Sequence, residues 1–227
     1  MNWAAIPQEL AVDSALGVAG DFARRTLNRF TRISILRVLV LERAALQVPP
    51  VPANDGFRHA VLTDAALQQY AQDAVNDLAP AFVATARAKG DRCFGVFDGD
   101  ILASYIWCSV RATEIQPGLV TSFDPQWTYT YKAFTAPVYR GQRLHARVKA
   151  VALSDPLYRY SRGALSCVDM TNLASMRSLT RMGAVCEGTL LAAYALGRYW
   201  THKSERCRHY NMRLKGAPHD RRGMNLA

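Results

Sequence analysis

One basic segment of the sequence reads Thr135-Ala-Pro-Val-Tyr-Arg-Gly-Gln-Arg-Leu-His145. It lies between a stretch rich in β-branched and aromatic residues and a stretch with helical apolar spacing. The preceding stretch, Thr128 to Thr135, predicts a strand, and Pro137 ends it because proline has no N–H for a strand ladder. Gly141 opens a helical pattern with Leu144 on its apolar face. The segment therefore predicts a basic turn at a helix N-terminus, where free N–H groups and the helix dipole favour a phosphate or pyrophosphate.

A second segment, Asn172-Leu-Ala-Ser-Met-Arg-Ser-Leu-Thr-Arg-Met-Gly-Ala184, predicts a short helix. Asn172 is a suitable N-terminal cap, and Gly183 ends the helix. Four apolar side chains recur at helical spacing and are expected to face the core: Leu173, Met176, Leu179 and Met182.

The turn Asp98-Gly99-Asp100 separates two apolar and aromatic runs, Arg92 to Phe97 and Ile101 to Trp107, and this pattern predicts a β-hairpin. The remaining segments predict further elements. Strands are expected over Ile35–Leu41, Ala164–Met170 and Val185–Tyr194, and helices from Thr63 through Val75 and over Leu78–Lys89. This order predicts an α/β (α+β) fold with a mixed sheet and helices on both faces.

The chain has 227 residues, 50% of them hydrophobic, and a net charge of +10. No segment approaches the roughly 20 apolar residues that a membrane-spanning helix needs, and no secretory signal is visible, so we expect a cytoplasmic protein. The five cysteines are widely spaced, which favours reduced thiols over a disulfide framework. The spacing of His202, Cys207 and His209 does not fit a zinc site, and we expect no metal.

The sequence suggests three regions. Residues 1–52 form an N-terminal extension with a basic amphipathic helix and the first strand, residues 53–200 the main domain, and residues 201–227 a basic tail. From Arg198 onward there are eight basic and two acidic residues. The amphipathic helix packs on the domain or rests on a membrane surface or a partner. The basic tail favours an anionic partner or serves solubility alone.

Together the two segments and the hairpin resemble the Gcn5-related N-acetyltransferase (GNAT) superfamily. Its acyl-CoA loop often runs Pro-x-Tyr-Arg-Gly, which matches Pro137 to Gly141. Its later helix has the pattern Asn-x-x-(Ala/Ser)-x-x-x-(Tyr/Leu)-x-(Lys/Arg)-x-Gly-(Phe/Ala), and the chain matches it at Asn172, Ser175, Leu179, Arg181, Gly183 and Ala184. The resemblance covers roughly residues 57 to 196 in element order, although its specific motifs occupy only about two dozen positions.

The resemblance implies a mostly antiparallel sheet with a central splayed pair of parallel strands, here Thr128–Thr135 and Ala164–Met170. The pantetheine arm of the acyl donor would insert between them and pair with the open strand edge. The residues implied in donor binding are Ala133, Phe134 and Thr135 for the arm, Arg140, Gly141, Gln142, Arg143, Leu144 and His145 for the pyrophosphate, and Asn172 and Ser175 beyond the arm.

The chain departs from the family pattern at three positions. Arg143 and His145 stand where the loop has glycines, and a Cβ there reduces the room for phosphate. Either Arg143 contacts phosphate directly, or the donor is an acyl-carrier protein. His145 is expected to contact phosphate or lie on the helix surface. Leu179 replaces the tyrosine that acts as an acid in many relatives, so another group or water would protonate the leaving thiolate.

The implied reaction is direct attack of a neutral amine on the thioester, with a base and an oxyanion donor. Asp169 is the candidate base; hydrogen bonding to a neighbouring loop is the alternative. Four aromatic residues are expected to border the acceptor or to serve as core packing: Tyr105, Trp107, Tyr129 and Tyr131. Acceptor selectivity would come from loops such as Thr113 to Trp127.

The leading prediction is an acetyl-CoA-dependent N-acetyltransferase acting on a small amine or amino sugar. One alternative is a long-chain N-acyltransferase whose donor is long-chain acyl-CoA or acyl-carrier protein, with a basic surface docking the acidic carrier. The other is a non-catalytic binding module of the same fold. Two further partners are considered: a membrane surface, contacted through the N-terminus, and nucleic acid, bound through the tail. Of these two, nucleic acid is the minor prediction.

Overall fold

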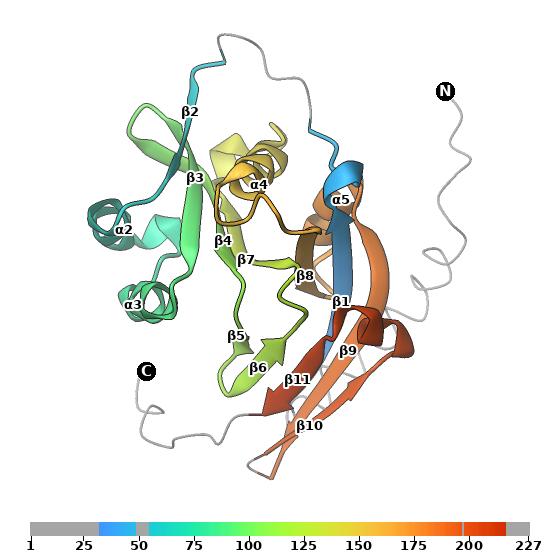
Figure 1. Cartoon of the computed structure of the whole chain (residues 1–227). Helices are drawn as coiled ribbons and strands as arrows, with labels where there is room; N and C mark the ends of the chain where they lie inside the picture. Colours follow the sequence, from blue (N-terminus) through green and yellow to red (C-terminus); the bar gives the residue numbers. More distant parts are fainter. Residues whose placement is uncertain (1–31, 49–54, 197, 217–227) are drawn as a thin grey trace.

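The computed structural model describes residues 32–48, 55–196 and 198–216 (Figure 1). Its strands are β1 (Arg32–Glu42), β2 (Phe57–Val61), β3 (Arg92–Asp98), β4 (Ile101–Ser109), β5 (Thr113–Gln116), β6 (Leu119–Ser122), β7 (Thr128–Thr135), β8 (Gly163–Asp169), β9 (Val185–Ala195), β10 (Arg198–Lys203) and β11 (Arg213–Gly216). Its α-helices are α2 (Asp64–Ala71), α3 (Pro80–Lys89), α4 (Leu144–Ser154) and α5 (Leu173–Arg181), and its 3-10 helices are η1 (Arg43–Ala45), η2 (Ala74–Asn76), η3 (Pro137–Tyr139) and η4 (Glu205–Tyr210).

Eight strands form one sheet in the order β10-β9-β1-β8-β7-β4-β3-β2. The neighbouring pairs described in this sheet are antiparallel except β7 and β8, which are parallel. That pair is in register only at Thr128 with Ala164 and at Tyr129 with Leu165. Beyond these positions the two strands separate, so the sheet divides into two halves, which lie left and right of centre in Figure 1.

Helices cover both faces of the β3–β4 hairpin. Successive strand residues point to opposite faces, so Cys93 packs with the residues of α2 and α3, whereas Phe94 packs with those of α4. The helix α5 shares a cluster with α4 and with β1 and β8. The predicted mixed sheet, with its splayed parallel pair and helices on both faces, is confirmed.

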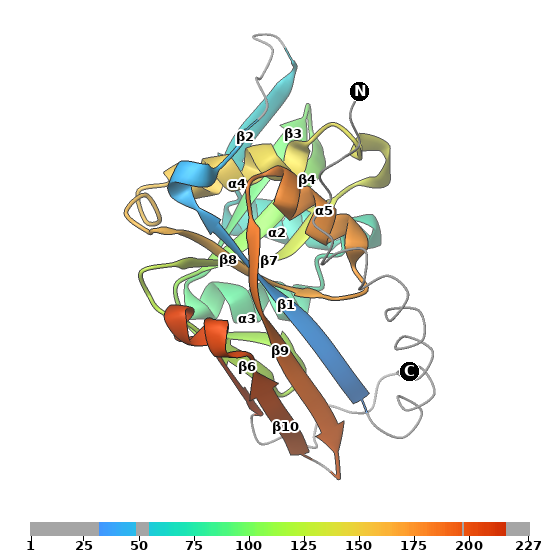
Figure 2. The same ribbon diagram turned by 90° about the vertical axis from the view of Figure 1, so that its right-hand side faces the viewer.

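The opposite face of β1, β8 and β9 is covered by a second, three-stranded sheet in the order β11-β6-β5. Two of its strands come from residues 113–127, which we expected to be a loop. Its third strand and η4 come from residues 201–216 of the predicted basic tail, where Cys207 and Met212 are fully buried. These residues are thus built into the fold, and β1 lies between β9 and β8 in the large sheet (Figure 2). The three-region division stays a prediction.

Most predicted elements are found, with two local corrections. The hairpin closes with Asp98 opposite Ile101, and Thr63 caps α2 by accepting from the Ala66 N–H at 3.3 Å. The helix expected through Val75 ends at Ala71, and Val75 is exposed in η2. Leu173, expected in the core, is 54% exposed because it is the first residue of α5 and precedes the helix's contact with the sheet.

The predicted amphipathic N-terminal helix and its membrane contact fall on residues outside the described ranges. Within those ranges no helix has the length and apolar character needed to cross a bilayer.

Gly183, which follows α5, allows the backbone at this point to lie close to the backbone of η1. Its φ is +96°, and a Cβ at this position would lie 2.1 Å from the carbonyl oxygen of Ala45. The same contact is held by the Gln47 N–H, which donates to the Met182 carbonyl at 2.9 Å. A side chain here therefore meets fixed backbone as well as an unfavourable φ.

We expect Gly183→Ala to lower the free energy of unfolding by about 3 kcal/mol or more. The matched control is Gly90→Ala, which has a similar φ of +88° but no atom within 4 Å of the new Cβ, so only the left-handed backbone penalty of about 1–2 kcal/mol applies. Urea denaturation of both variants measures the difference, and equal losses would contradict the contact.

Candidate functional site

The strands β7 and β8 separate at a small polar cluster, which we call the vertex cluster: Thr130, Ser166 and Lys149. Thr130 and Ser166 are the first residues beyond the paired positions, and their hydroxyl oxygens lie 2.6 Å apart. The Lys149 ammonium on α4 donates to both, at 3.1 Å and 3.3 Å. The cluster bridges the two strands where their backbone pairing ends.

A β-bulge turns β7 away from β8 just beyond this cluster. Tyr131 and Phe134 face Trp107 and Tyr105, so three steps along β7 match two along β4. Lys132 sits in the bulge with a φ of +46°, and its ammonium pairs with the Asp77 carboxylate at 2.5 Å. A bulge bends its strand, and this one directs the end of β7 away from β8.

The end of β7 presents an open backbone edge toward β8. The Ala136 N–H donates to the Ala103 carbonyl on the β4 side at 2.9 Å, and Thr135 is opposite Ser104 in the next register position. Because hydrogen-bonded and non-hydrogen-bonded pairs alternate in an antiparallel ladder, the Thr135 peptide groups face away from β4. An extended ligand with amide groups would find the Thr135 N–H there as a donor, whereas the Thr135 carbonyl already accepts from a side chain of the following turn.

The turn after β7 leads through η3 to the N-terminus of α4. Arg143 is the N-cap residue with a left-handed φ of +58°. Its carbonyl accepts from the Ala146 N–H at 3.0 Å, and the N–H groups of Leu144 and His145 before it have no intrahelical partner. A Cβ on Gly141 would meet no atom within 4 Å, so the space beside the turn is open. Arg140 donates from Nε to the Thr135 carbonyl at 3.3 Å. The turn thus joins the open edge of β7 to a set of free amides.

Neither a family model nor a curated protein matches the sequence. Solved structures are similar to it. A conserved protein of unknown function from Staphylococcus epidermidis has a TM-score of 0.51 and 10% identity, covering 76% of this chain and 65% of that one. A Drosophila protein has a TM-score of 0.50 and 16% identity, covering 80% of this chain and 58% of that one. A GCN5-related N-acetyltransferase from Kribbella flavida gives 0.45 and 19%, covering 75% and 62%.

The chain therefore spans less than two thirds of each of these structures, and at these identities the likeness shows the fold alone. The mostly antiparallel sheet and its separated parallel pair are those that the sequence resemblance implies. The fold is GNAT-like.

Within this GNAT-like fold, the residues of the predicted donor site lie together around the end of β7 and the start of α4. Ala133, Gly141, Gln142, Arg140 and Arg143 are exposed, Phe134 and Thr135 are half-buried, and Leu144 is buried. The Phe134 carbonyl accepts from the Ser104 hydroxyl at 2.8 Å, so this group faces β4. Donor binding by this set stays a prediction.

His145 differs from the expectation for its side chain. Its Nδ1 atom lies 3.0 Å from the Ser178 hydroxyl on α5, and its Nε2 atom is buried without a partner among the described residues. Burial, together with the nearby Lys149 charge, lowers its pKa to about 3. The imidazole is therefore neutral and turned toward α5, and it offers no positive charge to a phosphate.

Asn172, predicted to line the donor arm, caps α5. Its Oδ1 atom accepts from the Ser175 N–H at 3.1 Å, which satisfies one of the free N–H groups of the first turn. Leu179, at the position of the family's acid, is 3% exposed and packs in the core. Neither side chain brings an ionisable group to the site.

Asp169 ends β8 in a tight turn. Its Oδ1 atom accepts from the Thr171 N–H at 2.9 Å and from the Thr171 hydroxyl at 2.6 Å. This is the hydrogen bonding to a loop that the sequence left open as the alternative. A role as base stays a prediction.

The four aromatic residues expected beside the acceptor are core side chains. Tyr105, Trp107 and Tyr129 are each at most 1% exposed, and the Tyr105 hydroxyl donates to the carbonyls of Asn76 and Asp77 at 3.0 and 3.1 Å. Tyr131 donates to the buried Asp91 carboxylate, and burial raises the pKa of this phenol. Three of the four therefore offer no surface to an acceptor in this structure.

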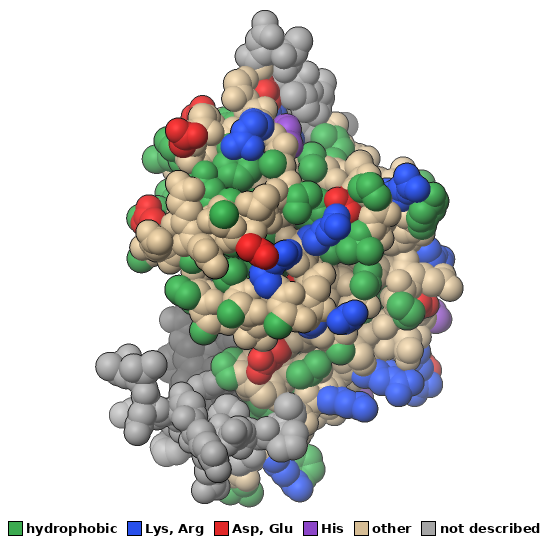
Figure 3. Space-filling model, turned by 60° about the vertical axis from the view of Figure 1, so that its left-hand side comes forward, with side chains coloured by type: hydrophobic (Ala, Val, Ile, Leu, Met, Phe, Trp, Pro, Cys, Tyr) green, Lys and Arg blue, Asp and Glu red, His purple; other side chains and the backbone are tan. Residues whose placement is uncertain are grey.

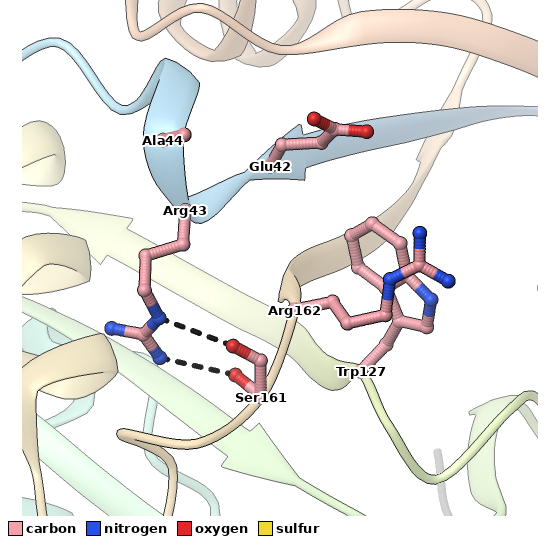
Figure 4. A pocket seen from close by; sticks show the side chains of 6 residues that line it. All are labelled: Glu42, Arg43, Ala44, Trp127, Ser161 and Arg162. Carbon is pink, nitrogen blue, oxygen red and sulfur yellow. Dashed lines mark hydrogen bonds between the residues drawn. The ribbon is translucent and has the colours of Figure 1, made fainter.

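A separate hollow lies where Ser161 and Arg162 lead into β8, and it is also lined by Glu42, Arg43, Ala44 and Trp127 (Figure 4). The side chain of Arg43 is committed there, since it donates to the carbonyls of Leu153, Tyr158 and Ser161 at 2.8, 2.7 and 3.1 Å. Arg162 stacks over the Trp127 ring at 5.3 Å. These contacts tie Arg43, the residue that directly follows β1, to the end of α4 and to the segment after it.

The vertex cluster is the part of the site that sequence reasoning missed. Lys149 follows Val148 in α4 and lies one turn from both His145 and Leu153, and this spacing was the available signal. Its hydroxyl partners come from two strands distant in sequence, so their meeting required the topology.

His145 makes the free energy of unfolding depend on pH. The unfolded chain binds a proton near the ordinary pKa of 6.5, whereas the folded state binds it only near pH 3. The contribution of the neutral His145 to the free energy of unfolding is therefore fully present above pH 6.5, and it is lost as the pH falls toward 3. We expect His145→Gln to reduce the slope of unfolding free energy between pH 4 and 6 by up to about 1.4 kcal/mol per pH unit.

Urea denaturation at a series of pH values measures that slope. The control is His202→Gln, which removes an exposed imidazole on β10. Identical slopes in wild type and His145→Gln would contradict the depressed pKa.

Proposed function

We propose that the protein is an acyl-CoA-dependent N-acyltransferase that transfers an acyl group, acetyl in the simplest case, to a primary amine of a small molecule or amino sugar. The observation that carries the proposal is the separation of β7 from β8 beyond two paired positions, with the open edge of Thr135 leading to the free amides of α4. The resemblance of the two sequence motifs supports the same assignment.

The donor's extended arm would pair with the β7 edge as an added strand, with main-chain hydrogen bonds supplying affinity. Its pyrophosphate would lie at the turn from Arg140 to Leu144, where amides, the helix dipole and exposed arginines favour negative charge. In support, Arg140 and Arg143 are exposed at this end of the sheet, and the space beside Gly141 is open.

In the reaction, the neutral amine would attack the thioester carbon, forming the C–N bond as the C–S bond breaks. Backbone N–H groups near the bulge at Lys132 would stabilise the negative oxygen of the tetrahedral intermediate. The amine's proton would pass to water or to Asp169, and the thiolate would take a proton from water, since Leu179 supplies none.

Charge on the surface bears on the choice of donor. In the view of Figure 3, which brings the side of α2 and α3 forward, basic side chains are spread over the face with acidic ones among them. This mixed pattern does not single out a docking area for an acidic carrier protein on that face. A small acyl-CoA donor therefore has priority for testing.

The direct test measures thiol release from acetyl-CoA over a panel of primary amines, with thermal stability followed in CoA, acetyl-CoA and palmitoyl-CoA. Acetyl-CoA should raise the melting temperature and at least one amine should release thiol. Stabilisation only by palmitoyl-CoA would identify a long-chain acyl-CoA as the donor, and transfer only from acyl-carrier protein would identify that carrier as the donor. Tight CoA binding without any transfer would favour a binding module.

Arg140 provides a sharper prediction for the turn. Its Nη atoms make no hydrogen bond within the described structure, and we expect Arg140→Ala to weaken CoA binding about tenfold, because a charge-assisted hydrogen bond contributes roughly 1.5 kcal/mol.

Isothermal titration calorimetry measures that change. Arg159→Ala is the matched control, because this exposed arginine lies beyond the opposite end of α4. An equal effect of the two variants would place the phosphates elsewhere.

A further inference from the structure

The Lys149 side chain is a buried cation without a described counter-ion. It is 1% exposed, and its two hydrogen-bond partners, Thr130 and Ser166, are neutral hydroxyls. None of the ion pairs in the described part of the chain includes it. An ammonium has three donors, so one remains available.

Such a group is costly to bury. Taking an ammonium out of water without an anionic partner costs several kcal/mol, and burial lowers the pKa of Lys149 to about 8. At pH 7 most of the population still carries the charge. The neighbouring Cys108 thiol does not neutralise it, because burial raises the pKa of that thiol. An uncompensated cation in this position favours an anion supplied from outside.

The position of Lys149 indicates where that anion would come from. Its ammonium bridges Thr130 and Ser166 at the first positions where β7 and β8 no longer pair. The proposed donor arm lies along the β7 edge, which runs from Thr135 back toward Thr130. An acyl group that points along this edge toward the vertex cluster ends close to the ammonium.

We propose that Lys149 binds the terminal carboxylate of the acyl group, so that the donor is the CoA thioester of a short dicarboxylic acid rather than of acetate. This inference rests on the proposed acyltransferase function and names the substrate class of the same site. The carboxylate would accept from the free Nζ donor, and Thr130 and Ser166 would keep the ammonium oriented between the two strands.

The test compares succinyl-CoA with butyryl-CoA, which have the same number of acyl carbons but differ in the terminal charge. Calorimetry with the wild-type chain should give at least tenfold tighter binding of succinyl-CoA. Lys149→Met, which keeps the length of the side chain and removes its charge, should abolish that preference. Lys215→Met, at an exposed lysine on β11, should retain it.

Each outcome decides the inference. Equal binding of the two thioesters by wild type, or a preference that survives in Lys149→Met, overturns it while leaving the acyltransferase proposal intact. Binding of neither thioester and no binding of CoA itself overturns both. The wild-type comparison needs no variant, so the proposal can fail even if Lys149→Met does not fold, and Lys149→Arg, which keeps the cation, should then retain the preference.

Discussion

The short register between β7 and β8 is the constraint on which the remaining structure depends. Two strands that pair along their whole length satisfy each other's peptide groups, whereas these two share only the positions of Thr128 and Tyr129 with Ala164 and Leu165. The peptide groups beyond must find other partners. The bulge at Lys132 and the vertex cluster replace backbone pairing with side-chain contacts, and they leave the end of β7 open.

Packing from both sides keeps the two half-sheets together although their backbones separate. The helix α4 packs on β3 and β4 and also reaches β7, while the small sheet and η4 cover β1, β8 and β9. Arg43, which directly follows β1, bonds one carbonyl at the end of α4 and two in the segment after it.

Local chemistry made much of this fold predictable. The Asp98-Gly99 turn, the β-branched strand of residues 128–135 and the Asn172 cap each depend on neighbouring residues, and each is found as expected. What failed depends on distant residues. The small sheet forms because residues 213–216 return to pair with residues 119–122, and His145 turns to α5 because Ser178 is there. The hydrogen-bonding role of Lys149 is visible only in the folded chain, where Thr130 and Ser166 lie side by side.

The most direct measurement of the central claim is amide hydrogen–deuterium exchange with and without CoA. If the donor arm pairs with the open edge of β7, CoA will slow exchange at the Thr135 amide and at the first amides of α4, while the amides of β3 remain unchanged. Unaltered exchange along the end of β7 in a chain saturated with CoA, or protection confined to the hollow lined by Arg43 and Trp127, would contradict the account.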